Sequence, residues 1–71
     1  MSTCAVVFEQ TSTGYSAYVP DLPGCIVTGK TFEETERLIH EGVTIHIRSM
    51  RKDGYEIPAP STRTGYVETA A

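Results

Sequence analysis

The stretch Val19-Pro20-Asp21-Leu22-Pro23-Gly24-Cys25 decides the fold. Its two prolines fix two φ angles and remove two backbone donors, and Pro23-Gly24 offers the positive-φ position of a type II turn. The chain must therefore leave one strand, make a rigid corner and enter another strand.

A capped helix follows this corner. Residues 25–28 form a short strand that ends at Gly29, and Thr31-Phe32-Glu33-Glu34 has the pattern of a capping box. The Thr31 hydroxyl can accept a hydrogen bond from the Glu34 amide, and the Glu34 carboxylate can reach back to the Thr31 amide. We predict a helix from residue 31 to about residue 52, which Asp53-Gly54 ends because glycine readily adopts the left-handed cap conformation.

The predicted helix has one apolar stripe, made of Phe32, Ile39, Val43, His46 and Met50. At 100° per residue, these five side chains fall within about 40° of one direction. A single stripe indicates that the helix lies on one face of a sheet. Gly42 lies within the stripe and costs about 1 kcal/mol of helix propensity relative to alanine, so we expect it to permit close approach of the helix backbone to the sheet.

The remaining strands come from residues 4–9, 15–19 and 64–69. The first two form a hairpin, because a polar loop ending in Gly14 joins a β-branched, aromatic run to an alternating one. Residues 64–69 are predicted to form a fourth strand at a sheet edge, parallel to a strand already present. The sequence therefore predicts an α+β fold of order β-β-β-α-β, with a mostly antiparallel sheet and one helix packed on one face.

Length and composition restrict the class of protein. The 71 residues make a single domain, residues 1–71, whose core supplies only about 3–5 kcal/mol, so we expect a homodimer or a higher homo-oligomer. The net charge is −3 and the six basic residues are scattered, which argues against direct binding of nucleic acid. Because the apolar runs are short and no signal peptide begins the chain, we expect a cytoplasmic protein with no membrane segment.

The titratable residues do not form a recognisable catalytic or metal site. Metal-assisted cleavage of phosphodiesters needs converging carboxylates, whereas the acidic residues of the predicted helix lie largely on its polar side. His40 and His46 are separated by 240° around the helix and cannot share a metal ion. Cys4 and Cys25 are expected as reduced, buried thiols, two strand spacings apart and beyond disulfide reach. We expect no catalytic residues, no metal and no cofactor, and a protein that is not an enzyme.

The chain resembles the HicB-like antitoxin family over residues 6–60. The matching motifs are the run 14–25, the helix entry 29–31 with its two glutamates, the helix segment 41–47, the exit 53–54 and the run 57–60. Gly42 is one departure, since the family usually carries alanine there. The resemblance implies a partial ribonuclease H-like fold with sheet order 3-2-1-4.

The same resemblance implies a function. Family antitoxins bind a small RNA-cleaving toxin and neutralise it by occluding its active surface, and full-length members add a C-terminal DNA-binding domain. We expect no separate DNA-binding domain in this chain and a small basic toxin as its partner. Two alternatives remain: a stand-alone oligomeric module that binds a small ligand or a peptide, and a residual metal-dependent nuclease.

Four residues at and before the corner are candidate partner-binding residues: Tyr18, Asp21, Leu22 and Pro23. Leu22 is expected at the tip of a rigid exposed loop, which would lose little entropy on binding. Tyr18 is expected on the polar face of its strand, where an aromatic side chain favours an interface. A corner that only fixes strand geometry is the alternative interpretation, and an unpaired edge strand offers a further surface for dimerisation by sheet extension.

Overall fold

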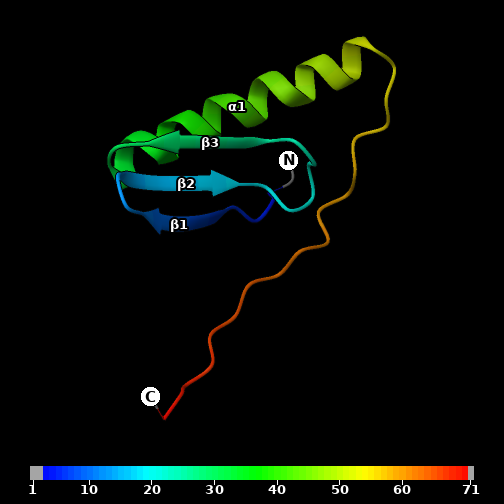
Figure 1. Ribbon diagram of the computed structural model, residues 1–71. Helices are drawn as coiled ribbons and strands as arrows, with labels where there is room; N and C mark the ends of the chain where they lie inside the picture. Colours follow the sequence, from blue (N-terminus) through cyan, green and yellow to red (C-terminus); the bar gives the residue numbers. More distant parts are fainter. Residues whose placement is uncertain (1–2, 71) are drawn as a thin grey trace.

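Three strands and one helix make up the fold in a computed structural model that describes residues 3–70. Strands β1 (Val7–Thr11), β2 (Gly14–Tyr18) and β3 (Ile26–Gly29) form an antiparallel sheet in the order β1-β2-β3, and helix α1 (Phe32–Lys52) covers one face of it (Figure 1). The α+β class, the hairpin and the long helix agree with the sequence prediction. In the described residues, no helix is both long and apolar enough to cross a membrane.

Two successive turns build the corner between β2 and β3. The Leu22 amide donates to the Val19 carbonyl oxygen at 3.0 Å, and the Cys25 amide donates to the Leu22 carbonyl oxygen at 3.1 Å. A third bond, from the Val19 amide to the Cys25 carbonyl oxygen at 3.1 Å, closes the two turns into one unit. Gly24 has a φ of 85°, as the predicted type II turn requires.

The corner turns Leu22 into the core. Leu22 is only 4 % exposed, because it lies at the junction of the two turns where the chain folds back toward the sheet. The expectation of Leu22 at an exposed loop tip is therefore wrong. The buried core consists of Ala17, Val19, Leu22, Cys25 and Ile39.

The apolar stripe of α1 faces the sheet as predicted and is wider than the five residues named. Ile39 is buried, Val43 and Met50 pack against the core, and His46 is half-buried; Ile47, which flanks the stripe, packs against the core too. Phe32 is 36 % exposed. Its ring nevertheless packs on Phe8 of β1 and Tyr15 of β2, with ring centroids 4.6 and 5.8 Å apart, so the start of α1 is anchored to the sheet by aromatic contacts.

Both ends of α1 are capped. The Thr31 hydroxyl accepts a hydrogen bond from the Glu34 amide at 3.1 Å, as predicted, whereas the Glu34 carboxylate accepts from the Lys30 amide at 3.2 Å instead of the Thr31 amide. At the other end, Gly54 has a φ of 80° and donates to the Arg51 carbonyl oxygen. Together with the bond from the Tyr55 amide to the Met50 carbonyl oxygen, this is a Schellman motif.

The helix and the sheet approach each other more closely at Gly29 than at Gly42. A Cβ atom on Gly29 would lie 3.0 Å from the Thr35 amide nitrogen, and Thr35 is fully buried with its hydroxyl bonded to the Thr31 carbonyl oxygen at 2.7 Å. A Cβ atom on Gly42 would lie 3.7 Å from Val27 Cγ1, which is an ordinary van der Waals contact. The close approach expected at Gly42 is therefore wrong.

The C-terminal segment leaves the body of the molecule without forming a strand (Figure 1). Residues 64–69 were expected as a fourth strand, but they have no secondary structure, and Tyr66 and Val67 are 101 % and 87 % exposed. The predicted fourth strand is therefore wrong for the single chain, and the sheet order stops at three strands in the described residues. A strand needs an edge to pair with, and this segment runs away from both sheet edges.

Candidate protein-binding surface

The carboxylate of Asp21 holds the C-terminal segment against the corner. It accepts hydrogen bonds from the amide and the hydroxyl of Ser61, each at 3.1 Å, and from those of Thr62, at 3.2 and 2.8 Å. These bonds, the one from the Thr62 hydroxyl foremost, lower the pKa of the Asp21 carboxyl below its ordinary value. We call Asp21, Ser61 and Thr62 the latch. Asp21, one of the four candidate partner-binding residues, is therefore hydrogen-bonded to residues of its own chain.

The latch keeps a short apolar segment over one end of the core. Residues 57–62, which we call the strap, place Ile57, Pro58 and Pro60 around a cavity of about 100 Å³ whose other walls include Leu22, Val43 and Ile47. Leu22 thus contributes to the core under the strap. It is not available as an exposed contact.

Tyr18 and Pro23, the other two candidates, lie at the surface. Tyr18 pairs with Val7 on β1 and Ile26 on β3, and these three side chains form a row across the sheet. Phe8 and Tyr15 contact Phe32 of the helix, so strand alternation puts the row on the opposite, open face. Tyr18 and Ile26 are 37 % and 64 % exposed.

The corner extends this row into an apolar surface. Tyr18, Pro20, Pro23 and Ile26 surround a shallow hollow of about 350 Å³, and we call these four residues the corner face. Tyr18 and Pro23 were predicted from the sequence as partner-binding residues, whereas Ile26 was not. Ile26 could have been predicted from the sequence. Cys25 belongs to the core, and the next residue of a strand points to the opposite face of the sheet.

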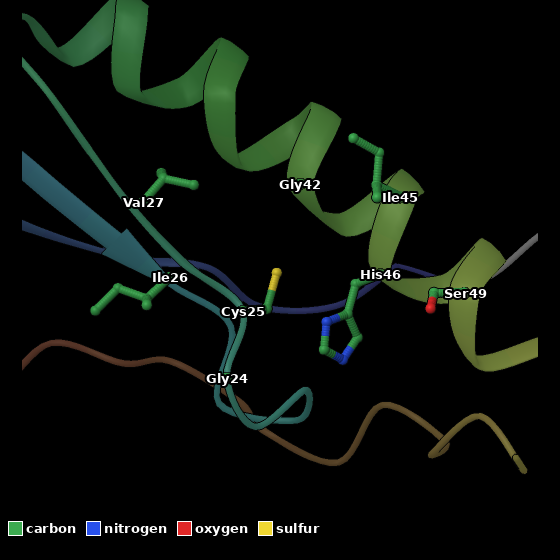
Figure 2. Close-up of a pocket in the computed structure, with 8 residues that line it drawn as sticks. All are labelled: Gly24, Cys25, Ile26, Val27, Gly42, Ile45, His46 and Ser49. Carbon is green, nitrogen blue, oxygen red and sulfur yellow. The ribbon is translucent and has the colours of Figure 1, made fainter. Parts of the chain in front are cut away.

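A second hollow adjoins the corner face along β3. It has a volume of about 320 Å³ and lies between the corner with β3 on one side and Gly42, Ile45, His46 and Ser49 of α1 on the other (Figure 2). Figure 2 shows the His46 ring projecting from the helix toward the corner and the Val27 side chain pointing to the helix. Ile45, 63 % exposed, and Ile26 both line the hollow, so one apolar strip runs from the corner face over the β3 edge to α1.

The titratable groups of this region do not converge. Among residues 3–70, no group of three or more His, Cys, Asp or Glu side chains could hold a metal ion. Cys4 and Cys25 are free thiols, and burial, with a smaller contribution from Cys4, raises the pKa of the Cys25 thiol. Cys25 therefore stays protonated and packs as a small apolar side chain.

Comparison with known proteins identifies relatives of the whole described fold. Residues 4–70 match a family described as HicB-like antitoxin of bacterial toxin-antitoxin systems. The chain is 33 % identical over 67 residues to "Antitoxin HicB 2" of Photorhabdus laumondii, covering 93 % of this chain and 48 % of that protein. It is 32 % identical over 62 residues to an uncharacterised 14.9 kDa protein of Haemophilus phage HP1, covering 87 % of this chain and 47 % of that protein.

A solved structure is also similar to this chain. A chain of the "HicA3 and HicB3 toxin-antitoxin complex" superimposes with a TM-score of 0.67 and 28 % identity, over 79 % of this chain and 65 % of that one. The present chain spans about half the length of the Photorhabdus and phage proteins. The match over residues 4–70 shows that the chain belongs to the HicB-like antitoxin family of bacterial toxin-antitoxin systems.

Proposed function

We propose that this chain is an antitoxin-type protein, not an enzyme, that binds a small basic RNA-cleaving toxin and neutralises it by covering the toxin's active surface. The observation that carries the proposal is membership of the HicB-like antitoxin family over nearly the whole chain. The structural likeness to a chain of a toxin-antitoxin complex supports it. Such a role places the chain in the cytoplasm, where messenger RNA is translated.

The apolar strip is the surface that we assign to the toxin. Tyr18 and Ile26 are exposed neighbours on adjacent strands, and the exposed Ile45 lies across the second hollow from Ile26; apolar and aromatic side chains of this kind are typical of an interface centre. The corner below them is held by three backbone hydrogen bonds, so little conformational entropy is lost when a partner binds. The net charge of −3 favours encounter with a cationic protein.

The test begins with capture of the partner from the native host. The tagged full-length chain is purified by affinity, and the bound proteins are identified by mass spectrometry. We expect a stoichiometric small basic protein that arrests growth when expressed alone, cleaves RNA when purified and is inhibited by one equivalent of this chain.

Substitutions locate the surface. Tyr18→Ala combined with Ile26→Ala should weaken inhibition of RNA cleavage at least tenfold, because truncation of a hot-spot residue at an interface centre costs about 2 kcal/mol or more. Tyr55→Ala is the matched control, since Tyr55 is also an exposed aromatic residue, 67 % accessible, but lies outside the strip. Recovery of the homo-oligomer alone, or of a partner that neither cleaves RNA nor arrests growth, would contradict the proposal. It would favour the stand-alone module that binds a ligand or a peptide.

A further inference from the structure

Gly42 is an unfavourable residue in the middle of α1. Apart from proline, glycine is the poorest residue for a helix interior. Close packing does not require it, because a Cβ atom at this position would meet only Val27 Cγ1, at the ordinary contact distance of 3.7 Å. Its backbone conformation does not require it either, since within residues 3–70 the glycines with positive φ are Gly14, Gly24 and Gly54. The contacts of the described chain therefore do not account for a glycine here.

The missing side chain of Gly42 leaves space in the second hollow. This hollow of about 320 Å³ opens between α1 and β3, and Gly42 lines it. On the side of the corner, Gly24 also lines the hollow without a side chain, so each of the two facing walls contains a glycine (Figure 2). A Cβ atom on Gly42 would be directed to Val27, which also lines the hollow, and would occupy part of this space.

The lining of the hollow is mostly apolar. Ile26 and Val27 come from β3, and Ile45 comes from α1. The polar side chains, His46 and Ser49, both belong to the helix. Of the residues that line the hollow within the described chain, none is Asp, Glu, Lys or Arg. Such a space favours a large apolar side chain, because a charged group would lose its hydration there without gaining an opposite charge.

The second hollow is continuous with the surface that we assign to the toxin. Ile26 and Ile45 are both exposed, stand on its two sides and belong to the apolar strip. A partner that covers the strip therefore also covers the mouth of the hollow. Because the centres of protein interfaces are packed about as densely as protein interiors, we expect a side chain of the partner to fill this space.

We propose that Gly42 determines which toxin this chain recognises, because its missing side chain admits a large apolar side chain of the toxin between α1 and β3. The inference rests on the proposed function, since it concerns the same surface. A toxin with a small residue at the matching position leaves a void, and one with a charged residue buries that charge unpaired, so both bind more weakly. Gly42 thus lowers the stability of the helix and supplies specificity.

The first experiment compares binding with stability. The probe is the RNA-cleaving protein captured with the tagged chain, and isothermal titration calorimetry gives its Kd for the full-length protein and for each variant. Gly42→Ala should weaken binding about tenfold, because an extra methyl group in a closely packed space forces its neighbours apart. Gly42→Leu should weaken binding further. Thermal unfolding of free Gly42→Ala should show no loss of stability, which distinguishes a filled hollow from a misfolded chain.

Thr44→Ala is the matched control. Position 44 also lies in α1, and alanine is favoured over threonine in a helix as it is over glycine. Thr44, however, lies on the other side of the helix, where it lines a hollow between α1 and β1. This variant should bind the probe as tightly as the unchanged protein. An equal loss of affinity in Thr44→Ala and Gly42→Ala would overturn the proposal, since helix stability and not the hollow would then control binding.

The second experiment locates the partner's side chain. In the complex of the isotope-labelled full-length chain with the unlabelled probe, intermolecular nuclear Overhauser effects should join the α protons of Gly42 to one large apolar side chain. Absence of these effects, or equal affinity of Gly42→Ala and the unchanged protein, would overturn this inference and leave the proposed function standing. Capture of no RNA-cleaving protein would overturn both.

Discussion

Replacement of Gly42 by alanine should stabilise the protein. Gly42 lies in the middle of α1, where alanine is favoured over glycine by about 1 kcal/mol because it has less backbone entropy to lose. The added methyl group would meet only Val27 Cγ1, at 3.7 Å, so nothing has to move. We expect the free energy of unfolding to rise by about 1 kcal/mol, which raises the midpoint of thermal unfolding by roughly 4–8 °C in a chain of this size.

Thermal and urea unfolding, both followed by circular dichroism, measure this change. Protein concentration must be equal for all variants, because dimerisation would add a concentration-dependent term. Gly29→Ala is the matched control: the same substitution, at a site where the new Cβ atom would lie 3.0 Å from the Thr35 amide nitrogen and 3.1 Å from its Cα atom. Neither backbone atom can move away alone, so this variant should lose about 1–3 kcal/mol.

The two glycine variants must therefore change stability in opposite directions. A neutral or destabilising Gly42→Ala would refute the reasoning, since it would mean that β3 or another molecule approaches the helix more closely at Gly42 than the described contacts allow. A harmless Gly29→Ala would show that the contact with Thr35 is not the point that sets the helix-to-sheet distance.

Three further predictions concern the latch and the helix cap. Asp21→Asn removes one of two acceptor oxygens, so the Ser61 and Thr62 amides should exchange with solvent faster in nuclear magnetic resonance; unchanged rates would show that another contact holds the strap. Because the folded pKa of Asp21 is lowered from its ordinary 3.8, the latch's stabilising contribution should be fully present above that value and be lost as the pH falls through the lowered pKa. The chemical shifts of the Ser61 and Thr62 amides report this, and opening near neutral pH would contradict it. Thr31→Ala should lower the free energy of urea unfolding by about 1 kcal/mol, whereas Thr31→Ser keeps the acceptor and should lose much less.

The elements that depend on neighbouring residues could be predicted from the sequence. Thr31 caps the helix because its hydroxyl meets an amide three residues later, and Gly54 ends it because no side chain opposes a positive φ. The turn at Pro23 is equally local. These features depend on contacts between residues no more than about five positions apart. A short sequence pattern therefore includes both partners of each contact.

The features that were missed depend on contacts between distant residues or on the direction of a turn. Leu22 was expected outside, but two turns in succession send it inward, and a residue pattern does not give the direction of the second turn. The bonds that Asp21 accepts from Ser61 and Thr62 join residues 40 and 41 positions apart, and no periodicity links them. The strand pattern of residues 64–69 was recognised, but a strand also requires an available edge, and within one chain the latch leads it elsewhere.

The length of α1 has a consequence for how the protein unfolds. The helix has 21 residues and is about 31 Å long, whereas the four residues of β3 span only about 13 Å, so the last turns of the helix extend past the sheet. There Ile47 packs under the strap, and the strap is fastened by Asp21. We therefore expect the far end of α1 and the strap to open together as one cooperative unit, less stable than the sheet, with Asp21 setting how often it opens.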